Sequence, residues 1–237
     1  MTANILNSLL YILSIVFYMS TVIFMYKKFG KTGLFVWSAL SVIVANIEAV
    51  KMVQMFGMNC GLGNAVYASS FLVTDILSEK YGKKYATKAV NIGLVSTIAW
   101  VLISQQLLLF IPNELDFISP AMNELFTVSP IFALTGIFTY AVVQRADVHL
   151  YELWWKLTDK LFKNHTKGLW LRNNGSTLVS QLIDTIVFTS IIAMFGIYPW
   201  SEVPGMIIIT YVLKASANVL DTPFCYWARK IKPKDEL

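Results

Sequence analysis

The sequence predicts an all-α polytopic membrane protein with seven transmembrane helices, because of its composition, its apolar runs and the placement of its basic residues. Of the 237 residues, 56% are hydrophobic and 14% are charged, whereas a soluble domain carries about 25% charged residues. The apolar residues form long runs, and about 20 such residues suffice to cross the hydrocarbon core. No polar linker divides the chain, so we expect residues 1–237 to form a single integral membrane domain.

The candidate spans are bounded by charged or turn residues. They are residues 5–26, 34–56, 64–79, 88–111, 129–149, 177–198 and 204–227. The first has neither a basic leading region nor a small-residue cleavage site, so we expect a retained helix and not a signal peptide. The third is only about 24 Å long if helical, so we expect it to be broken or to begin inside the protein.

The basic residues indicate the orientation of the chain. Of the 19 lysines and arginines, all but Lys51 and Lys214 lie in or beside the segments that follow the first, third, fifth and seventh spans. The loops at 57–63, 112–128 and 199–203 contain none. The positive-inside rule therefore predicts an outside N-terminus and a cytoplasmic C-terminus. The net charge of +5 follows from this topology, so no nucleic-acid partner is expected.

Several ionisable side chains fall inside the apolar spans. They are Glu48, Lys51, Asp75, Asp184, Lys214 and Asp221. Each costs at least about 2.5–3.5 kcal/mol near the bilayer centre, so such residues persist mainly where they are paired, hydrated or used. Their number predicts a polar cavity for transport or ligand binding, and argues against a simple anchor.

The second span combines small residues with two of these charges. Ser41, Ala45 and Ala49 recur at every fourth position, which allows a neighbouring helix to approach closely. Glu48 and Lys51 lie beside that seam, where they are predicted either to contact a ligand or to pair with each other. Asn46 points elsewhere and is a candidate for ligand or interhelical contact.

Polar stripes at three- and four-residue steps mark three further spans, because residues with this spacing share a helix face. In the third span they are Tyr67, Ser70 and Thr74, with Asp75 beside them, and in the sixth they are Thr177, Gln181 and Asp184. In the seventh they are Tyr211, Lys214, Asn218, Asp221 and Cys225. An alternative for Lys214 is a salt bridge to Asp184 or Asp75 that only holds the helices together.

The connecting segments carry weaker signals. Residues 113–127 predict a short outer interfacial helix, and residues 150–176, which mix tryptophans with lysines, predict an amphipathic segment in the membrane plane. Asn173-Asn174-Gly175-Ser176 predicts a turn into a helix N-cap. Gly82 is typical of a helix C-cap, so the charges of Glu79 and Lys80 before it are expected to be structural. No Cys/His cluster has metal spacing, so neither a metal nor another cofactor is expected.

The polar motifs occur in an order that resembles the queuosine-precursor transporter family, also called the vitamin-uptake-transporter family. The motifs are Asn46-Ile-Glu-Ala-Val-Lys51, Tyr67-Ala-Ser-Ser-Phe-Leu-Val-Thr-Asp-Ile-Leu-Ser-Glu-Lys-Tyr-Gly82, Asp147-Val-His149, Arg172-Asn-Asn-Gly-Ser-Thr-Leu-Val-Ser-Gln-Leu-Ile-Asp-Thr185, Lys214 and Leu220-Asp-Thr-Pro223. The resemblance covers roughly residues 34–230. It implies import of 7-deazaguanine bases, such as 7-cyano- or 7-aminomethyl-7-deazaguanine or queuine, across the bacterial cytoplasmic membrane for tRNA modification.

The resemblance also implies an architecture. Residues 31–230 would form a six-helix core related to the substrate-binding subunits of energy-coupling-factor transporters. Some family members begin near the second span, so residues 1–30 would be an additional N-terminal helix. A homo-oligomer and a separate energy-coupling module remain open.

The chemistry of a deazaguanine suggests roles for the polar residues. Its N–H and amino group suit a carboxylate, its carbonyl oxygen needs a donor and its flat face suits an aromatic ring. Glu48, Asp75 or Asp184 is expected to bind the guanine-like edge, Gln181, Asn46 or Lys214 the carbonyl, and Tyr67, Phe71 or Tyr211 the ring. Lys51, Ser70 and Asn218 complete the predicted site. Asp75, Asp184 and Asp221 are candidates for proton coupling.

Three other functions compete with this one. A substrate-binding subunit would need a separate ATPase, because the chain has no Gly-x-x-x-x-Gly-Lys-Ser/Thr motif. A retinal protein would use a lysine in the last helix, but here Asp221 follows Lys214, in the reverse of the usual order. An enzyme is not expected, because no Gly-x-Ser-x-Gly, His-Glu-x-x-His or Cys/His nucleophile pair is present.

Overall fold

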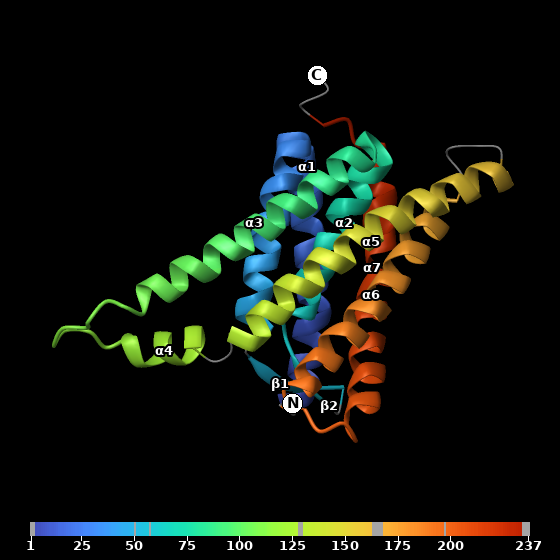
Figure 1. Ribbon diagram of the computed structural model, residues 1–237. Coiled ribbons are helices and arrows are strands. Elements are labelled where there is room, and N and C mark those ends of the chain that lie inside the picture. The colour runs from blue at the N-terminus through green and yellow to red at the C-terminus, as the bar shows by residue number, and fades with distance from the viewer. Residues whose placement is uncertain are drawn as a thin grey trace.

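The computed structural model describes residues 3–49, 51–56, 58–127, 130–162, 168–196 and 198–233. Its elements, in chain order, are α1 (Ala3–Ala49), β1 (Met52–Met55), β2 (Met58–Gly61), α2 (Asn64–Tyr81), α3 (Lys83–Leu107), α4 (Ser119–Thr127), α5 (Pro130–Phe162), α6 (Leu169–Met194) and α7 (Val203–Lys230). Figure 1 shows a helical bundle with one short hairpin at its base. The predicted all-α membrane fold is confirmed.

The helix α1 contains the first two predicted spans. It is interrupted at Gly30, whose φ of 58° and ψ of −141° lie in a region that glycine adopts at little steric cost. The chain reverses direction at Gly30. Two hydrogen bonds between the segments on either side show this: the Tyr18 hydroxyl donates to Glu48 Oε1 at 2.5 Å, and Asn7 Nδ2 donates to the Gln54 carbonyl at 3.0 Å. Residues 3–29 and 31–49 therefore form two antiparallel segments.

The second predicted span was wrong at its end. The helix stops at Ala49, and β1 pairs with β2 in an antiparallel hairpin whose register runs from Met52 opposite Gly61 to Met55 opposite Met58. Phe56 adopts a positive φ of 54° at the turn. The hairpin packs against α1, so its residues are apolar like those of the helix before it. Hydrophobicity alone therefore does not show where the helix ends and the strand begins.

The helix α2 occupies the centre of the bundle, where it packs against α1, α3, α5 and α7. Of the two alternatives for the third span, a broken helix is wrong, because Asn64–Tyr81 is one continuous helix of 18 residues. Its end was predicted correctly: Gly82 caps it with a φ of 84° and donates its N–H to the Ser78 carbonyl. Within the described part of the chain, α1, α3, α6 and α7 are the helices long and apolar enough to qualify as spans by composition. The helices α2 and α5 each carry one fully buried aspartate, Asp75 and Asp147, within the bundle.

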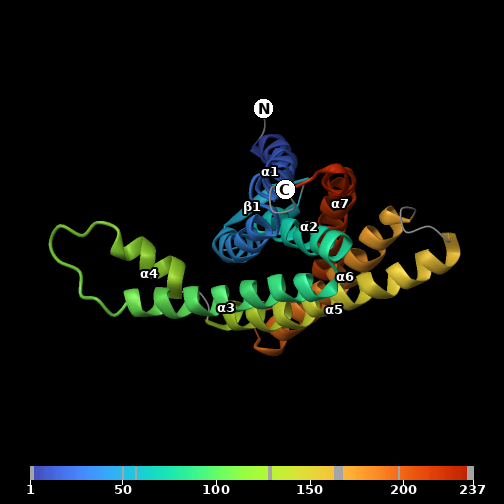
Figure 2. The same cartoon turned by 90° about the horizontal axis from the view of Figure 1, so that it is seen from above.

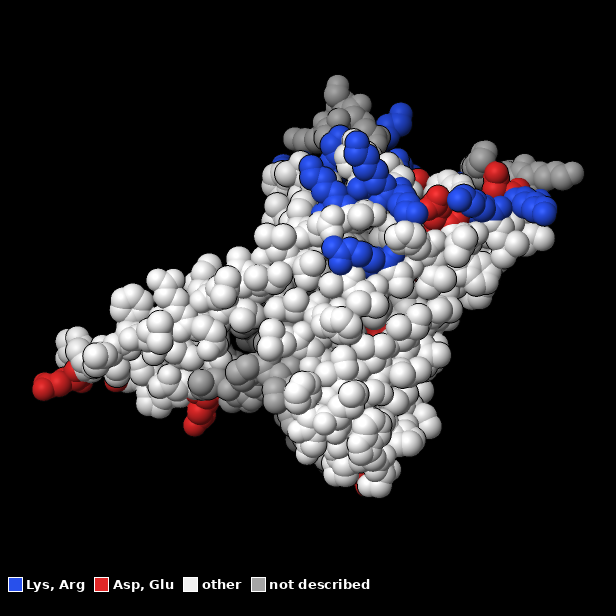
Figure 3. Space-filling view, in the orientation of Figure 1, with Lys and Arg blue, Asp and Glu red and all other residues white. Residues whose placement is uncertain are grey.

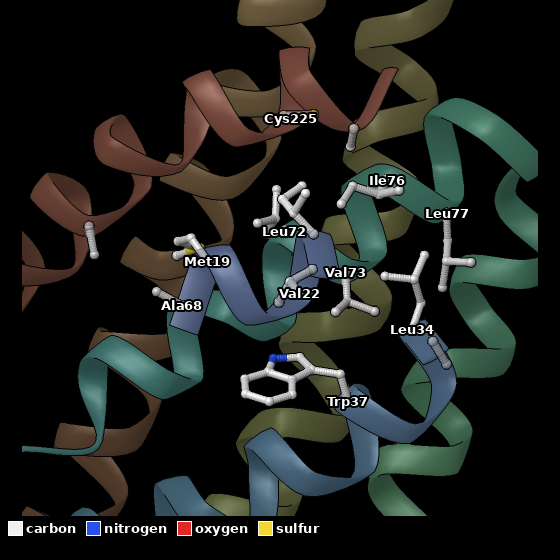
Figure 4. Close-up of a cluster of buried hydrophobic side chains, with 14 of the residues drawn as sticks. Met19, Val22, Leu34, Trp37, Ala68, Leu72, Val73, Ile76, Leu77 and Cys225 are labelled. Atoms are coloured by element: carbon white, nitrogen blue, oxygen red, sulfur yellow. The ribbon is translucent and has the colours of Figure 1, made fainter. Parts of the chain in front are cut away.

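The apolar core joins the N-terminal helix to the rest of the bundle. Figure 4 shows Met19 and Val22 from the first segment of α1 beside Leu72 of α2 and Cys225 of α7. The Trp37 indole N–H donates to the Ser69 hydroxyl at 2.9 Å. In a membrane such contacts stabilise by close packing and interhelical hydrogen bonds. The first segment of α1, residues 3–29, is thus an integral part of the core.

The segments between the later spans differ from prediction. Figure 2 shows α3 and α5 alongside each other, with α4 beside the far end of α3. The helix expected within residues 113–127 is present as α4. In contrast, the described parts of the segment expected at 150–176 do not form a separate element: α5 continues to Phe162 and α6 begins at Leu169. Residues 163–167 of that segment lie outside the described residues. The turn predicted at Asn173–Ser176 lies inside α6.

The charged residues are separated along the bundle. Figure 3 shows lysines and arginines gathered at one end of the molecule, which we call the basic end. This end contains the reversal at Gly30, the turn at Gly82 and the C-terminus of α7. The hairpin and the connection between α6 and α7 lie at the opposite end (Figure 1).

Candidate functional site

A cavity of about 300 Å³ lies between the helices near the opposite end. This volume is at the lower limit of typical small-molecule sites. Its walls come from α1, α2, α3, α5, α6 and α7 and from the loops beside α2 and α7. The lining residues are Val42, Ala45, Asn46, Ala49, Gly63, Asn64, Tyr67, Thr97, Gly136, Thr139, Tyr140, Asp184, Thr185, Phe188, Thr189, Tyr198, Met206, Thr210 and Lys214.

An ion pair and an aromatic ring form the charged wall of the cavity. Lys214 of α7 pairs with Asp184 Oδ2 of α6, and the side chains of both are 8% exposed. The Tyr67 hydroxyl of α2 donates to Asp184 Oδ1 at 3.0 Å. The Lys214 ammonium lies 5.5 Å from the centroid of the Tyr67 ring, within the range of a cation–π contact. The cavity wall thus combines a carboxylate (Asp184), an ammonium group (Lys214) and an aromatic ring (Tyr67).

Small residues allow close packing of the backbone in the cavity wall on the side of α1. A Cβ atom at Gly63 would lie 2.5 Å from the Ala45 carbonyl oxygen and 3.2 Å from the Ala49 nitrogen. The backbone before α2 therefore lies directly against the small-residue face of the second segment of α1. A Cβ at Gly136 would lie 3.4 Å from Asn46 Oδ1. The predicted close approach at the Ser41–Ala45–Ala49 face is confirmed.

A layer of buried polar residues lies between the cavity and the basic end. It contains Ser70, Thr74 and Asp75 of α2, Gln144 and Asp147 of α5, Asn173, Thr177, Ser180 and Gln181 of α6, and Asn218 and Asp221 of α7, all at most 1% exposed. We call this set the polar layer. On each of its four helices these residues follow or precede the cavity-lining residues by one to three turns.

Hydrogen bonds connect the carboxyl groups of the polar layer to α6. The Thr177 hydroxyl donates to Asp75 Oδ2 at 3.3 Å, and the Ser180 hydroxyl donates to Asp147 Oδ1 at 2.9 Å. Asn173 Nδ2 donates to Asp221 Oδ1 at 2.7 Å. Among the described residues, no lysine or arginine forms an ion pair with any of these three aspartates.

A second cavity, of about 360 Å³, lies at the basic end. Its lining residues are Ser78, Glu79, Gly82, Lys83, Val148, Tyr151, Glu152, Trp155 and Lys156. Hydrogen bonds from Lys83 and Lys156 hold the pKa of Glu152 below its usual range. The polar layer separates this cavity from the one near the opposite end, since its residues lie between the two sets of lining residues on α2 and α5.

The structure brings together only part of the predicted site. Asn46, Tyr67, Asp184 and Lys214 line the cavity. Ser70, Asp75, Gln181, Asn218 and Asp221 belong to the polar layer. Phe71 lies outside both sets and is buried, with its ring edge-on to Tyr67 at 5.4 Å. The salt bridge considered between Lys214 and Asp184 is confirmed, and it lies within the cavity wall.

Three predicted residues lie apart from the cavity. Glu48 accepts the hydrogen bond from Tyr18, and Lys51 is exposed in the turn after α1. The structure shows no ion pair between these two described residues. Tyr211 is half-buried and does not line the cavity. The helix ends at Ala49, so the face on which Glu48 and Lys51 were expected to meet does not exist.

Other polar residues were missed by the sequence analysis. Gln144 and Asp147 are 0% exposed, yet Asp147 was recognised only as part of a motif. Arg172 was assigned to a connecting segment and its buried role was missed. The signal that could have identified the first pair is helical spacing, because Gln144 follows Tyr140 by four residues and Asp147 follows Gln144 by three. Nothing local could have identified Arg172, because its partner is on α2.

Comparisons with known proteins agree with a transport site. Residues 61–228 match the family described as "Putative vitamin uptake transporter". The chain is also 37% identical over 232 residues to a protein of Bacillus subtilis (strain 168) named "Probable queuosine precursor transporter". The match covers 97% of this chain and 98% of that protein. No solved structure matches the chain.

Proposed function

Because this chain belongs to the vitamin uptake transporter family, we propose that it imports queuosine precursors, which are 7-deazaguanine bases, through the cavity around Asp184 and Lys214. The family resemblance noted in the motifs is confirmed, and the family is one of transporters and not of enzymes. The observation that carries the proposal is the grouping of a carboxylate, an ammonium and an aromatic ring on one cavity wall. It is supported by the near full-length similarity to a relative named for this substrate class.

The three groups match the hydrogen-bonding pattern of a guanine-like base. The carboxylate of Asp184 accepts from the ring N–H and the adjacent amino group, and such charge-assisted pairs are strong. The ammonium of Lys214 donates to the carbonyl oxygen. The ring of Tyr67 packs against the flat face of the base. Without a base bound, Asp184 and Lys214 satisfy each other, so the site stays neutral in both states.

The rest of the cavity suits the substituent at position 7 of the base. Its wall carries the amide of Asn46 and the hydroxyls of Thr139, Thr185 and Thr189. Hydroxyl and amide groups both donate and accept hydrogen bonds, so a cyano or an aminomethyl group would find partners. Queuine has a larger substituent and would fill more of the cavity, whose lining also includes Tyr198 and Met206.

The orientation follows from the charge distribution. We place the basic end in the cytoplasm of a bacterium by the positive-inside rule, which puts the N-terminus and the cavity near the outer face of the cytoplasmic membrane. A base arriving from outside would then meet Asp184 and Lys214 first. Release into the cytoplasm would require passage of the polar layer and opening of the basic end.

The test is a calorimetric titration of the purified protein with 7-cyano-7-deazaguanine, 7-aminomethyl-7-deazaguanine, queuine and guanine. We expect saturable binding of at least one deazaguanine, weaker binding of guanine, and loss of binding in Asp184→Asn. Glu124→Gln, which removes an exposed acid of α4, is the matched control and should bind as the unmodified chain does. Absence of binding to every base, or unchanged binding in Asp184→Asn, would refute the proposed site.

The same chain reconstituted alone into liposomes separates transport from a binding-subunit role. Uptake of the labelled base without any added ATPase is the expected result. Binding without uptake would identify a substrate-binding subunit that needs a coupling module. A retinal-type role is ruled out by the family to which the chain belongs.

A further inference from the structure

The polar layer concentrates negative charge where no cation balances it. Asp75, Asp147 and Asp221 are each 0% exposed and come from α2, α5 and α7. Asp75 lies within the electrostatic influence of both of the other carboxyls. Among the described residues none of the three has a basic partner. Three ionised carboxylates could not remain together in a medium of low dielectric constant without compensation.

The hydrogen bonds of the layer show what is missing. Within the polar layer, one buried side-chain nitrogen has no partner, Gln181 Nε2, and the buried oxygen atoms without a partner are Asp75 Oδ1, Gln144 Oε1, Asn173 Oδ1, Gln181 Oε1, Asn218 Oδ1 and Asp221 Oδ2. Asn173 donates an amide hydrogen to Asp221 Oδ1, while its own amide oxygen has no donor. Acceptors therefore outnumber donors, and buried acceptors without donors are costly. The layer lacks hydrogen-bond donors or a cation.

The backbone decides between a proton and a metal cation. Sodium sites inside membrane transporters draw on carbonyl groups exposed where helices unwind. Here α2, α5 and α6 are continuous helices through the layer, so their main-chain carbonyls are used within the helices. In α7, Pro223 has no N–H and leaves one carbonyl, that of Val219, without its intrahelical donor. One carbonyl does not make the shell that a metal cation needs, and among the described residues no group of three or more His, Cys, Asp or Glu side chains could hold a metal ion. A proton needs no such shell, because it converts a carboxylate oxygen into an O–H donor for a neighbouring amide oxygen.

We propose that Asp75, Asp147 and Asp221 form a buried proton-carrying site that couples movement of the base to inward movement of protons. This proposal rests on the proposed function for its coupling, though not for its protonation. A proton from the outer side binds to a carboxylate oxygen and is later released from that oxygen to the cytoplasmic side. Asp184, which the sequence suggested for this role, is excluded from it because Lys214 and Tyr67 already neutralise and bind it.

The groups that face the site define the route of the proton. Toward the outer cavity they are Asp184, Lys214 and Tyr67, and toward the basic end they are Glu79, Tyr151, Arg172 and Cys225. The first segment of α1 contributes apolar side chains such as Met19 and Val22 beside Cys225 (Figure 4). The charged groups at either side are paired, so the three carboxyls are the ones left to change their protonation.

The first experiment measures protonation without any substrate. Infrared spectra of the purified protein at neutral pH should show the C=O stretching band of protonated carboxylic acids, shifted by deuterium exchange. Asp75→Asn, Asp147→Asn and Asp221→Asn should each be compared with Asp116→Asn, which removes an exposed acid. We expect the band to weaken in at least one of the three buried variants and to be unchanged in Asp116→Asn. A protein with no such band, or a band indifferent to all three substitutions, would overturn the proposal.

The second experiment measures coupling in liposomes. Labelled base should be concentrated inside when an inward proton gradient is imposed, whereas a sodium gradient should have no effect. The Asp→Asn variants should keep exchange of labelled for unlabelled base but lose accumulation, which shows that they are folded and bind substrate. Accumulation driven by sodium, or accumulation unaffected in all three variants, would contradict the coupling. Failure of the unmodified chain even to exchange base would refute the proposed substrate, while the infrared result would still decide protonation.

Discussion

Arg172 of α6 and Glu79 of α2 form a buried bidentate ion pair between residues 93 positions apart in the chain. Arg172 Nη2 lies 2.8 Å from Glu79 Oε1, and Arg172 Nε lies 3.1 Å from Oε2. The two side chains are 1% and 5% exposed. The guanidinium also lies over the Trp155 ring at 4.5 Å, and Arg229 approaches Glu79 at 3.7 Å. This cluster joins α2, α5, α6 and α7 at the basic end.

Breaking this pair should destabilise the protein strongly. Glu79→Gln leaves the Arg172 charge without its carboxylate in a buried place, which costs about 3–5 kcal/mol in comparable cases. We expect a clear fall in the free energy of unfolding, measured by denaturant titration of the purified protein in detergent. Glu152→Gln is the control: this acid pairs with Lys83 at 2.5 Å but is 35% exposed, so the expected loss is about 1 kcal/mol or less. Equal losses in both variants would contradict the structural role of the buried pair.

The ion pair of Asp184 and Lys214 should behave as a coupled unit. Asp184→Asn and Lys214→Met each leave one buried charge without a partner, so each should lower stability. The double variant should be closer to the unmodified protein than either single variant, because it removes both charges together. Thermal unfolding of the four proteins tests this. Simple addition of the two single effects would show that the charges do not stabilise each other.

The Tyr67 side chain contributes a ring and a hydroxyl that substitution can separate. Tyr67→Phe removes the hydrogen bond to Asp184, which should weaken base binding by about 0.5–1.5 kcal/mol. Tyr67→Leu also removes the aromatic face and the contact with the Lys214 ammonium, so its effect should be larger. Calorimetric affinities for the deazaguanine that binds tightest provide the comparison. A Phe variant as weak as the Leu variant would show that the ring has no part in binding.

Gly63 should not tolerate a side chain. A Cβ there would lie 2.5 Å from the Ala45 carbonyl oxygen, which is backbone and cannot rotate away. Gly63→Ala should therefore shift the start of α2 against α1 and reduce both stability and base binding. Gly205→Ala in α7 is the matched control, because no atom lies within 4 Å of its Cβ position. Unchanged base affinity and unchanged unfolding of the Gly63→Ala protein would contradict this prediction, because they would show that the backbone of α1 moves aside for the added methyl group at little cost.

The turn before α4 should depend on pH. The hydroxyl of Ser119 and the backbone N–H groups of Ser119 and Ile118 donate to Asp116 and hold the pKa of that carboxyl below its usual value of 3.8. A lowered pKa means that the carboxylate stabilises the turn above the ordinary pKa, and that this contribution is lost as the pH falls below it. Hydrogen exchange at Ile118 and Ser119, corrected for its intrinsic pH dependence, should speed up on acidification. Asp116→Asn should remove that response, and an identical response in the variant would assign it to another group.

The sequence alone determined the properties that depend on one segment at a time. Whether a run of residues can cross a bilayer depends on its own length and polarity, so the approximate positions of the spans were predictable. The gathering of basic residues at one end was predictable as well, because they lie in alternate connecting segments. The stripes on α2, α6 and α7 were predictable for the same reason, because three- and four-residue spacing defines a helix face. The small-residue face at Ser41, Ala45 and Ala49 is also a local feature, and its close contact was found at Gly63.

The tertiary structure decided every property that depends on two segments together. Asp184 meets Lys214 across 30 positions of the chain and Tyr67 across 117, and the choice of partner was open until the helices were packed. Asp147 gained its importance only because α5 places it beside Ser180 of α6. Conversely, Glu48 and Lys51 are not part of the candidate site, because the helix α1 ends at Ala49, between them. A polar side chain in a membrane must find a partner, but which partner it finds depends on the arrangement of helices that are distant in sequence.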